Sequence, residues 1–281
     1  MLQEVKKYKV FTDDFNQGNA ATVVAYRGWH DAEMLEIARD SGTPVTVFVQ
    51  FSNEQAENTV LRYFSSEKEM AFCGHGTLAA GAFILQQYER NPIQVVSGSG
   101  TPIVISKSPQ GHFYFKTSRV SRLDMKPDKI EVAYMLGVNP EIILDDIPFC
   151  VASIGSPKLF VPLRHLTALD EVIPNFEQIR AWSEKYGVNG VYVYTFQETV
   201  KRNQDDKAVY INARGFNPLF GIPEDAATGV AAGALGDLLF QAGGLSEYVI
   251  QQGKHVGAKS EISVKIKTGS VEIGGSVLNL I

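Results

Sequence analysis

Three side chains that can exchange protons stand in short, glycine-containing turns ahead of alanine-rich segments. Cys73 and His75 lie in the stretch FCGHGTLAAGAFIL, and Asp225 lies in the stretch EDAATGVAAGALGDLL. Removing a proton beside a carboxylate needs a base at one face of the substrate and often an acid at the other. A thiol, an imidazole and a carboxylate can supply these groups, so the set predicts acid–base chemistry.

Each of these residues also has a plainer interpretation. A lone cysteine is more often a small buried hydrophobic residue than a nucleophile, and an aspartate ahead of a helix often only caps it. The turn favours a functional Cys73, because a helix N-terminus stabilises a thiolate. Cys150 stands in the apolar run Phe149-Cys150-Val151 and is predicted to be core. Neither cysteine has the neighbouring CxxC or histidine pair of a zinc site.

The two stretches are copies of one pattern. Leu78–Ala82 and Val230–Ala234 are identical at four of five positions, and the same alignment places Cys73 opposite Asp225, 152 residues later. A surface helix carries a charged stripe, whereas the first turns here are almost entirely Gly, Ala, Thr, Leu and Val. We therefore expect two helices buried on all sides. Glycines inside them, such as Gly81, lower helix stability and indicate close backbone packing.

Strand-like and helical patterns alternate around these turns. Asp31 is the expected N-cap of the first helix. Helices are predicted at Asp31–Asp40, His75–Gln87, Lys129–Leu136, Phe176–Tyr186 and Ala226–Ala242. Strands are predicted at Val5–Phe11, Thr22–Tyr26, Thr46–Phe51, Thr59–Phe64, Gln94–Val96, Ile103–Ser106, Phe113–Lys116, Pro148–Ala152, Leu159–Leu163, Gly190–Tyr194, Ala208–Ala213, Glu261–Ile266 and Ser270–Ile273.

The spacing of the repeat, about half of the 281 residues, predicts two similar α+β domains related by a pseudo-twofold axis. Each domain is expected to wrap a sheet or barrel around one central buried helix. The N-terminus of a helix binds carboxylates through its exposed N–H groups and its dipole. A site between the domains that faces both N-termini would therefore hold a small anionic molecule and exclude water.

Composition narrows the class of protein. The net charge of −5, with acidic and basic residues mixed along the chain, argues against nucleic acid as a partner. No apolar run has membrane-spanning length, and the N-terminus lacks the apolar core of a signal peptide. We therefore expect a cytoplasmic protein without a membrane partner, whose cysteines stay reduced.

Short motifs in a fixed order run through the whole chain: Phe11-Thr12, Gly18-Asn19-Ala20-Ala21, Glu69, Phe72-Cys73-Gly74-His75, Ser153-Ile154-Gly155, Phe160-Val161-Pro162-Leu163, Arg214, Phe216, Gly221 to Gly229, Gln252-Gly253 and Ser260. Their order and spacing resemble the PhzF-like isomerases of phenazine biosynthesis, a branch of the diaminopimelate epimerase fold. The resemblance implies epimerase-like domains at residues 1–118 and 119–281, with the last strand rejoining the first domain as an alternative. It also implies a biosynthetic isomerase without metal or organic cofactor, usually a homodimer.

Only some of the family's site residues are present in this sequence. His75 and Asp225 match the family's histidine and aspartate, and Cys73 completes the predicted catalytic set. Val45 stands where the phenazine enzymes carry their glutamate base, and Val230 stands where they carry a serine. The expected substrate-binding residues are Asn19, Gly74, Gly76, Thr77, Thr46, Thr228 and Gly229.

Three functions remain open at this level. The first is a cofactor-independent isomerase or epimerase that transfers protons on a small carboxylate. The second is a protein that binds a carboxylate metabolite without turnover, because a valine cannot exchange a proton. The third is a lyase or dehydratase that removes the same proton and then eliminates a leaving group.

Overall fold

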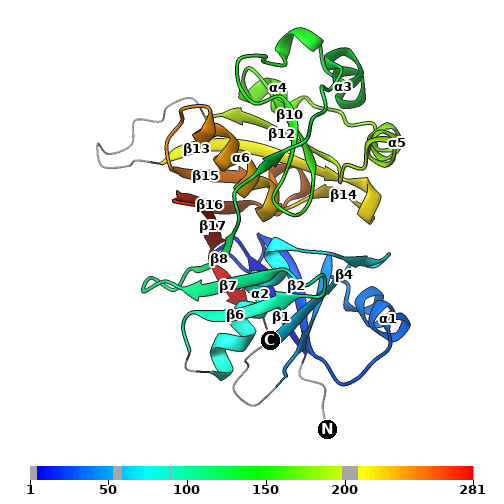
Figure 1. Cartoon of the computed structure of the whole chain (residues 1–281). Coiled ribbons are helices and arrows are strands. Elements are labelled where there is room, and N and C mark those ends of the chain that lie inside the picture. Colours follow the sequence, from blue (N-terminus) through cyan, green and yellow to red (C-terminus); the bar gives the residue numbers. More distant parts are fainter. Residues whose placement is uncertain (1–4, 53–58, 89, 198–207, 281) are drawn as a thin grey trace. The chain divides into compact units, whose positions relative to one another are not determined.

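The structure, a computed structural model, describes residues 5–52, 59–88, 90–197 and 208–280. It divides into two compact units (Figure 1). Unit 1 comprises Met1–Thr117 and Glu272–Ile281, and unit 2 comprises Ser118–Val271. The chain passes from unit 1 to unit 2 once and returns within its last strands.

Unit 1 is a mixed sheet with two helices. Its strands pair in the order β18-β1-β2-β3-β4-β6-β7-β8, and β5 forms a short antiparallel edge on β4. The β2–β3 and β4–β6 pairs are parallel. The elements are β1 (Val5–Val10), β2 (Asn19–Ala25), α1 (Asp31–Ser41), β3 (Val45–Gln50), β4 (Thr59–Phe64), β5 (Glu69–Met70), α2 (Gly74–Gln87), β6 (Ile93–Ser97), β7 (Pro102–Lys107), β8 (Phe113–Thr117), β17 (Ser270–Gly275, which begins in unit 2) and β18 (Val277–Asn279).

Unit 2 repeats this order of pairings. Its strands run β9-β10-β11-β12-β13-β15-β16, with β14 as a short antiparallel partner of β13 and with parallel β11–β12 and β13–β15 pairs. The elements are β9 (Ser121–Arg122), α3 (Lys129–Leu136), η1 (Pro140–Ile142), β10 (Cys150–Ser153), β11 (Lys158–Pro162), α4 (Leu166–Asp170), α5 (Phe176–Tyr186), β12 (Val191–Phe196), β13 (Val209–Asn217), η2 (Pro218–Phe220), β14 (Ile222–Asp225), α6 (Gly229–Gln241), β15 (Glu247–Gln252), η3 (Lys254–Val256) and β16 (Ser260–Lys267).

The two alanine-rich helices are the central helices of their units. Every residue from Gly74 to Ile84 of α2 is buried, and so is every residue from Gly229 to Leu239 of α6. Strands β1, β2, β3, β7 and β8 surround α2, and β10, β15 and β16 pack against α6. A Cβ on Gly81 would lie 2.5 Å from Cγ2 of Ile105, so this helix can approach the sheet only with glycine there. The prediction of two fully buried helices is confirmed.

The outer helices cover the opposite sheet faces with amphipathic surfaces. Helix α1 buries Met34 and Ala38 against a cluster that includes Phe48 and Phe64. In unit 2, α3, α4 and α5 cover an apolar cluster built on β11 and β12. Strands β3, β11 and β12, which lie beneath these helices, are buried on both faces, and this explains their long β-branched runs. Strands β7 and β16 instead alternate buried residues with more exposed ones.

Three sequence predictions are wrong in detail. The N-cap of α1 is His30 rather than Asp31, and Glu33 Oε2 accepts a 2.8 Å hydrogen bond from the backbone N–H of His30. Helix α6 begins at Gly229, three residues later than expected, so Asp225 does not cap it. The predicted strands omitted the six-residue strand β15 and the shorter strands β5, β9, β14 and β18, and the predicted helices omitted α4.

Candidate functional site

The first turn of α2 is fixed by hydrogen bonds around Cys73. The residue is the N-cap of the helix, and its carbonyl accepts the backbone N–H of Thr77 at 2.9 Å. The Thr77 hydroxyl donates to the same carbonyl at 2.8 Å and lies 2.8 Å from the Tyr63 hydroxyl. Burial raises the pKa of Tyr63 far above its usual range, and the nearby Cys73 adds to the rise. Tyr63 is therefore a neutral hydrogen-bonding group here.

His75 joins two predicted site residues. Its Nδ1 lies 3.4 Å from the Cys73 Sγ and 3.3 Å from the amide Nδ2 of Asn19. Asn19 begins β2 and is buried, and His75 is 5 % exposed. Each ring nitrogen of the imidazole either donates or accepts a hydrogen bond, depending on the tautomer. The fold thus brings a thiol, an imidazole and an amide together at the start of α2.

The glycines of this turn allow β3 to approach the helix. A Cβ on Gly76 would lie 2.8 Å from the Val47 side chain and 3.4 Å from that of Val45. Val45 therefore faces the first turn of α2, where Gly74 is the first helical residue. A glutamate at position 45 would place its carboxylate beside this turn.

Thr46 is separated from these groups. Successive strand side chains point to opposite faces, so Thr46 shares the face of Phe48, which packs against α1. Its hydroxyl is buried without a hydrogen-bond partner in the described residues. The structure brings Asn19, Gly74, Gly76 and Thr77 to the α2 terminus, but it places Thr46 on the other side of the sheet.

In unit 2, Asp225 is the last residue of β14 and pairs with Gly215 of β13. It is 6 % exposed, and its Oδ2 accepts a 2.8 Å hydrogen bond from the hydroxyl of Thr228, the N-cap of α6. A Cβ on Gly215 would lie 2.7 Å from that hydroxyl, so glycine leaves room for the turn. The carboxylate thus stands just before the helix and is tied to its cap, with Gly229 as the first helical residue.

Gln252 organises the backbone of this turn. Its Nε2 donates to the carbonyl of Asp225 at 2.8 Å, and its Oε1 accepts the N–H of Thr228 at 3.1 Å. The Tyr192 hydroxyl donates to the same Oε1 at 2.9 Å. Burial raises the pKa of Tyr192 well above its ordinary value, and the charge of Asp225 raises it further. Tyr192 therefore stays a donor and holds Gln252 in this orientation.

One charged residue near Asp225, Lys158, was not predicted from the sequence. Lys158, the first residue of β11, is 4 % exposed, and its Nζ donates hydrogen bonds to the Asn189 carbonyl and the Asn217 Oδ1. Burial lowers the pKa of Lys158 to about 7, while the negative charge of Asp225 opposes that fall. A lysine at the start of an apolar strand was the only sequence signal, and it does not reveal the partner.

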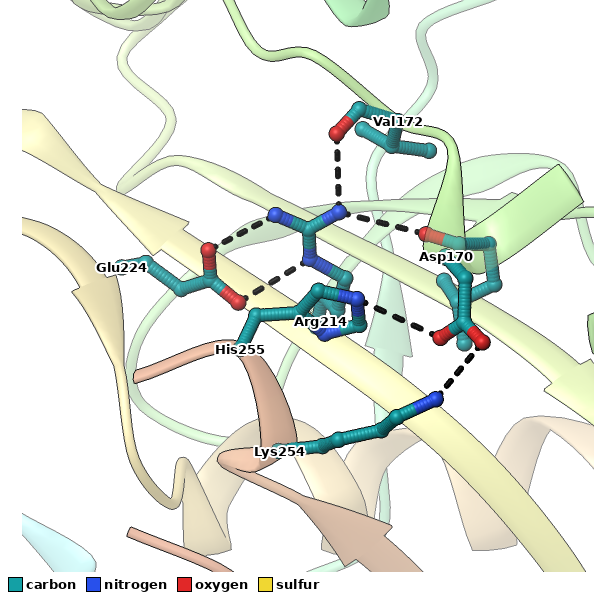
Figure 2. A network of polar contacts seen from close by, with 7 residues as sticks. Asp170, Val172, Arg214, Glu224, Lys254 and His255 are labelled. Carbon is teal, nitrogen blue, oxygen red and sulfur yellow. Dashed lines mark hydrogen bonds and ion pairs between the residues drawn. The ribbon is translucent and has the colours of Figure 1, made fainter. Parts of the chain in front are cut away.

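A separate ionic network surrounds Arg214 and Asp170 (Figure 2). The Arg214 guanidinium binds both carboxylate oxygens of Glu224, at 3.0 and 2.8 Å, and donates to the carbonyl of Val172 at 2.8 Å. The Asp170 carboxylate forms an ion pair with Lys254 Nζ at 2.6 Å, and its other oxygen lies 3.2 Å from His255 Nε2. Because Glu224 directly precedes Asp225, the Arg214–Glu224 pair fixes the strand that carries the carboxylate.

The structure was also compared with the requirements of a metal site and of a membrane-spanning helix. Across residues 5–52, 59–88, 90–197 and 208–280, no group of three or more His, Cys, Asp or Glu side chains is arranged to hold a metal. Within the same ranges, none of the helices combines the length and apolar character needed to cross a bilayer.

Comparison with known proteins identifies relatives over nearly the whole chain. The family model described as "Phenazine biosynthesis-like protein" matches residues 8–279. The chain is 29 % identical to the "Uncharacterized isomerase YfhB" of Bacillus subtilis, over 98 % of this chain and 92 % of that protein.

Solved structures show the same fold. The Bacillus anthracis "phenazine biosynthesis protein, PhzF family" superimposes with a TM-score of 0.81 at 24 % identity, covering 100 % of this chain and 98 % of that one. A hydroxyproline epimerase from Agrobacterium vitis, solved with bound trans-4-hydroxy-L-proline, gives a TM-score of 0.61 at 11 % identity, covering 100 % and 92 % of the two chains. The expected diaminopimelate epimerase-like fold is therefore confirmed.

Proposed function

Because this chain belongs to the phenazine biosynthesis-like (PhzC-PhzF) family, we propose that it is a cofactor-independent isomerase or epimerase acting on a small carboxylate. Relatives along the whole chain carry the name isomerase. The acid–base set in this proposal is Asp225, His75 and Cys73. The observation that carries the proposal is that both units place proton-exchanging side chains at the start of their central buried helix.

The chemistry requires one group to remove a proton from the carbon beside the carboxylate and another to return a proton. In unit 1, Cys73 and His75 are 3.4 Å apart, so a proton can pass between the thiol and the imidazole. In unit 2, the Asp225 carboxylate is held by Thr228 and can accept or deliver a proton. The N–H groups at a helix N-terminus favour a negative charge, so the starts of α2 and α6 suit the carboxylate of a substrate.

Solvent deuterium incorporation tests the proposal. The protein is incubated in heavy water with proline and hydroxyproline epimers, diaminopimelate and a dihydro-hydroxyanthranilate, and exchange is followed by mass spectrometry. We expect exchange with at least one compound and its loss in Cys73→Ser and Asp225→Asn. The matched controls Cys150→Ser and Asp145→Asn should retain it, because neither residue lies in the turn before a central helix. Equal loss in the controls would contradict the assigned residues.

A second candidate is a protein that binds a carboxylate without turnover. Val45 and Val230 favour it, because both are buried beside a helix terminus and neither can carry a proton. Ligand-induced thermal stabilisation without deuterium exchange would support this function. Val45→Glu would then test whether one carboxylate beside Gly76 is enough to restore proton transfer.

A further inference from the structure

Lys158 is the one lysine that is buried among the described residues. Burying an ammonium group is unfavourable unless it is paired and hydrogen-bonded. Its Nζ meets two oxygens, the Asn189 carbonyl and the Asn217 Oδ1. An ammonium group has three N–H donors. After these two bonds, a third donor still needs an acceptor and the positive charge still needs a nearby negative charge.

The sheet of unit 2 places Asp225 on the same face as Lys158. Alternate residues of a strand share a face, so Lys158 shares its face with Phe160, whose ring contacts Tyr192. Tyr192 lies opposite Gly215, and Gly215 lies opposite Asp225. The opposite face carries Leu159, Val161 and Val193 against the outer helices.

The charged and titratable groups on each face are therefore distinct. Around Lys158 they are Asp225 from β14, Tyr192 and Tyr194 from β12, Cys150 from β10 and the cation Arg122 from β9. Arg122 and Lys158 both lie opposite Ala152, and burial raises the pKa of Tyr194 well above its ordinary value. Burial keeps Tyr192 neutral and raises the pKa of the Cys150 thiol, so neither group supplies a negative charge near neutral pH. Asp225 is left as the counter-ion.

The Figure 2 network does not compete for that role. Arg214 lies opposite Val193 and its guanidinium stands 5.1 Å from the Phe216 ring, so it belongs to the apolar face with Glu224. Glu224 is already bound at both oxygens by Arg214. Arg214 thus binds the carboxylate of the residue before Asp225, from the sheet face opposite to Lys158.

We propose that Lys158 is the positioning residue for Asp225: its buried ammonium group orients the carboxylate from the same face of the sheet, and loss of the lysine proton removes that positive charge from the site. The proposal rests on the proposed function for its catalytic consequence, but the Lys158–Asp225 coupling is independent of it. The protonation of Lys158 changes close to neutral pH, because burial lowers its pKa to about 7. Catalysis that depends on Asp225 should therefore change in the same range.

The first test measures the coupling without any substrate. The protein is labelled with ¹³Cε-lysine, and the Lys158 resonance is assigned by its absence in Lys158→Arg. We expect this resonance to titrate near pH 7 and to move to lower pH in Asp225→Asn, since the negative charge of Asp225 favours the ammonium form. Asp145→Asn is the control and should leave the titration unchanged. Identical titration in the wild type and Asp225→Asn would overturn the proposal.

The second test measures the consequence for proton transfer. With an active substrate, the wild-type rate of deuterium exchange should inflect near pH 7. Lys158→Met should lose about tenfold or more of the rate. Lys158→Arg should keep more of the rate without the inflection, because a guanidinium does not lose its proton in this range. An inflection that persists in both variants would contradict the role of Lys158.

The two tests separate the inference from the function on which it builds. Coupled titration without exchange on any substrate would leave Lys158 as the partner of Asp225 and remove the isomerase proposal. Exchange that depends on Asp225 but not on Lys158, with uncoupled titration, would support the isomerase and remove the positioning role. Thermal unfolding of each variant identifies any that fail to fold.

Discussion

The hydroxyl of Thr228 donates a 2.8 Å hydrogen bond to the carboxylate of Asp225, three residues before it in the chain. Thr228 caps α6, whereas Asp225 ends β14, so this bond joins the strand that carries the carboxylate to the helix that follows it. The Gln252 side chain bonds both residues from β15. The carboxylate is therefore held by the N-cap residue of α6 and by the turn before it, and it does not itself cap the helix.

Removing this bond should affect both stability and activity. Thr228→Val keeps the shape of the side chain but leaves Asp225 and Gln252 without the hydroxyl. We expect a loss of about 1–3 kcal/mol in the free energy of unfolding and a clear fall in deuterium exchange. Thr167→Val, at an exposed position of unit 2, is the matched control and should change neither. Unchanged exchange in Thr228→Val would show that the Asp225 orientation does not need this bond.

The Arg214–Glu224 pair should be important for folding. Its side chains are only 7 % and 10 % exposed, so Arg214→Met leaves a buried carboxylate without its partner. We expect a loss of about 3–5 kcal/mol in the free energy of unfolding, measured by urea denaturation. Lys254→Met removes the more exposed Lys254–Asp170 pair and should lose about 0–1 kcal/mol. Similar losses in the two variants would contradict the difference in burial.

Lys158 should make stability depend on pH. Its pKa is about 7 in the folded protein and near 10.5 when exposed, so between these values the unfolded chain binds the extra proton. Stability contributed through Lys158 therefore rises from pH 7 towards pH 10.5 and is lost as pH falls through that window. Urea unfolding is measured at neutral pH and at about pH 9.5. The rise in the free energy of unfolding between these two conditions should be smaller in Lys158→Met and unchanged in Lys126→Met. An identical rise in both variants would assign it to other groups.

The two cysteines should differ in reactivity. Burial raises the pKa of the Cys150 thiol, so little thiolate forms there near neutral pH. Cys73 caps α2, and a helix N-terminus favours the thiolate. Iodoacetamide near neutral pH should therefore label Cys73 and spare Cys150 until the protein unfolds. Mass spectrometry of Cys73→Ser and Cys150→Ser assigns the sites, and equal slow labelling of both would remove Cys73 from the acid–base set.

Much of the fold was predictable because the central helices have an unusual composition. The Gly- and Ala-rich segments around Gly81 and Gly233 contain almost no polar residues, so only a fully buried position suits them. The repeat also predicts two similar units, and the pairings of β1–β7 and β10–β16 follow one order. These features are local in sequence or repeat at a constant interval.

The errors arose where long-range contacts decide the structure. Strict repeat symmetry placed Asp225 at a helix cap, but hydrogen bonds from Thr228 and Gln252 turn residues 226–228 out of the helix. Lys158 was not predicted, because its partners Asn189, Asn217 and Asp225 lie far from it along the chain. Thr46 stays a prediction: its strand turns the side chain towards the face of Phe48, away from the start of α2.

The most direct measurement is deuterium incorporation from heavy water into small carboxylates by the wild type, Asp225→Asn and Asp145→Asn. Acid–base isomerisation predicts that the wild type and Asp145→Asn incorporate deuterium at the carbon beside the carboxylate, and that Asp225→Asn does not. Exchange that survives in Asp225→Asn would contradict the central role of Asp225. Thermal stabilisation by a carboxylate that the wild type never exchanges would identify a binding protein instead.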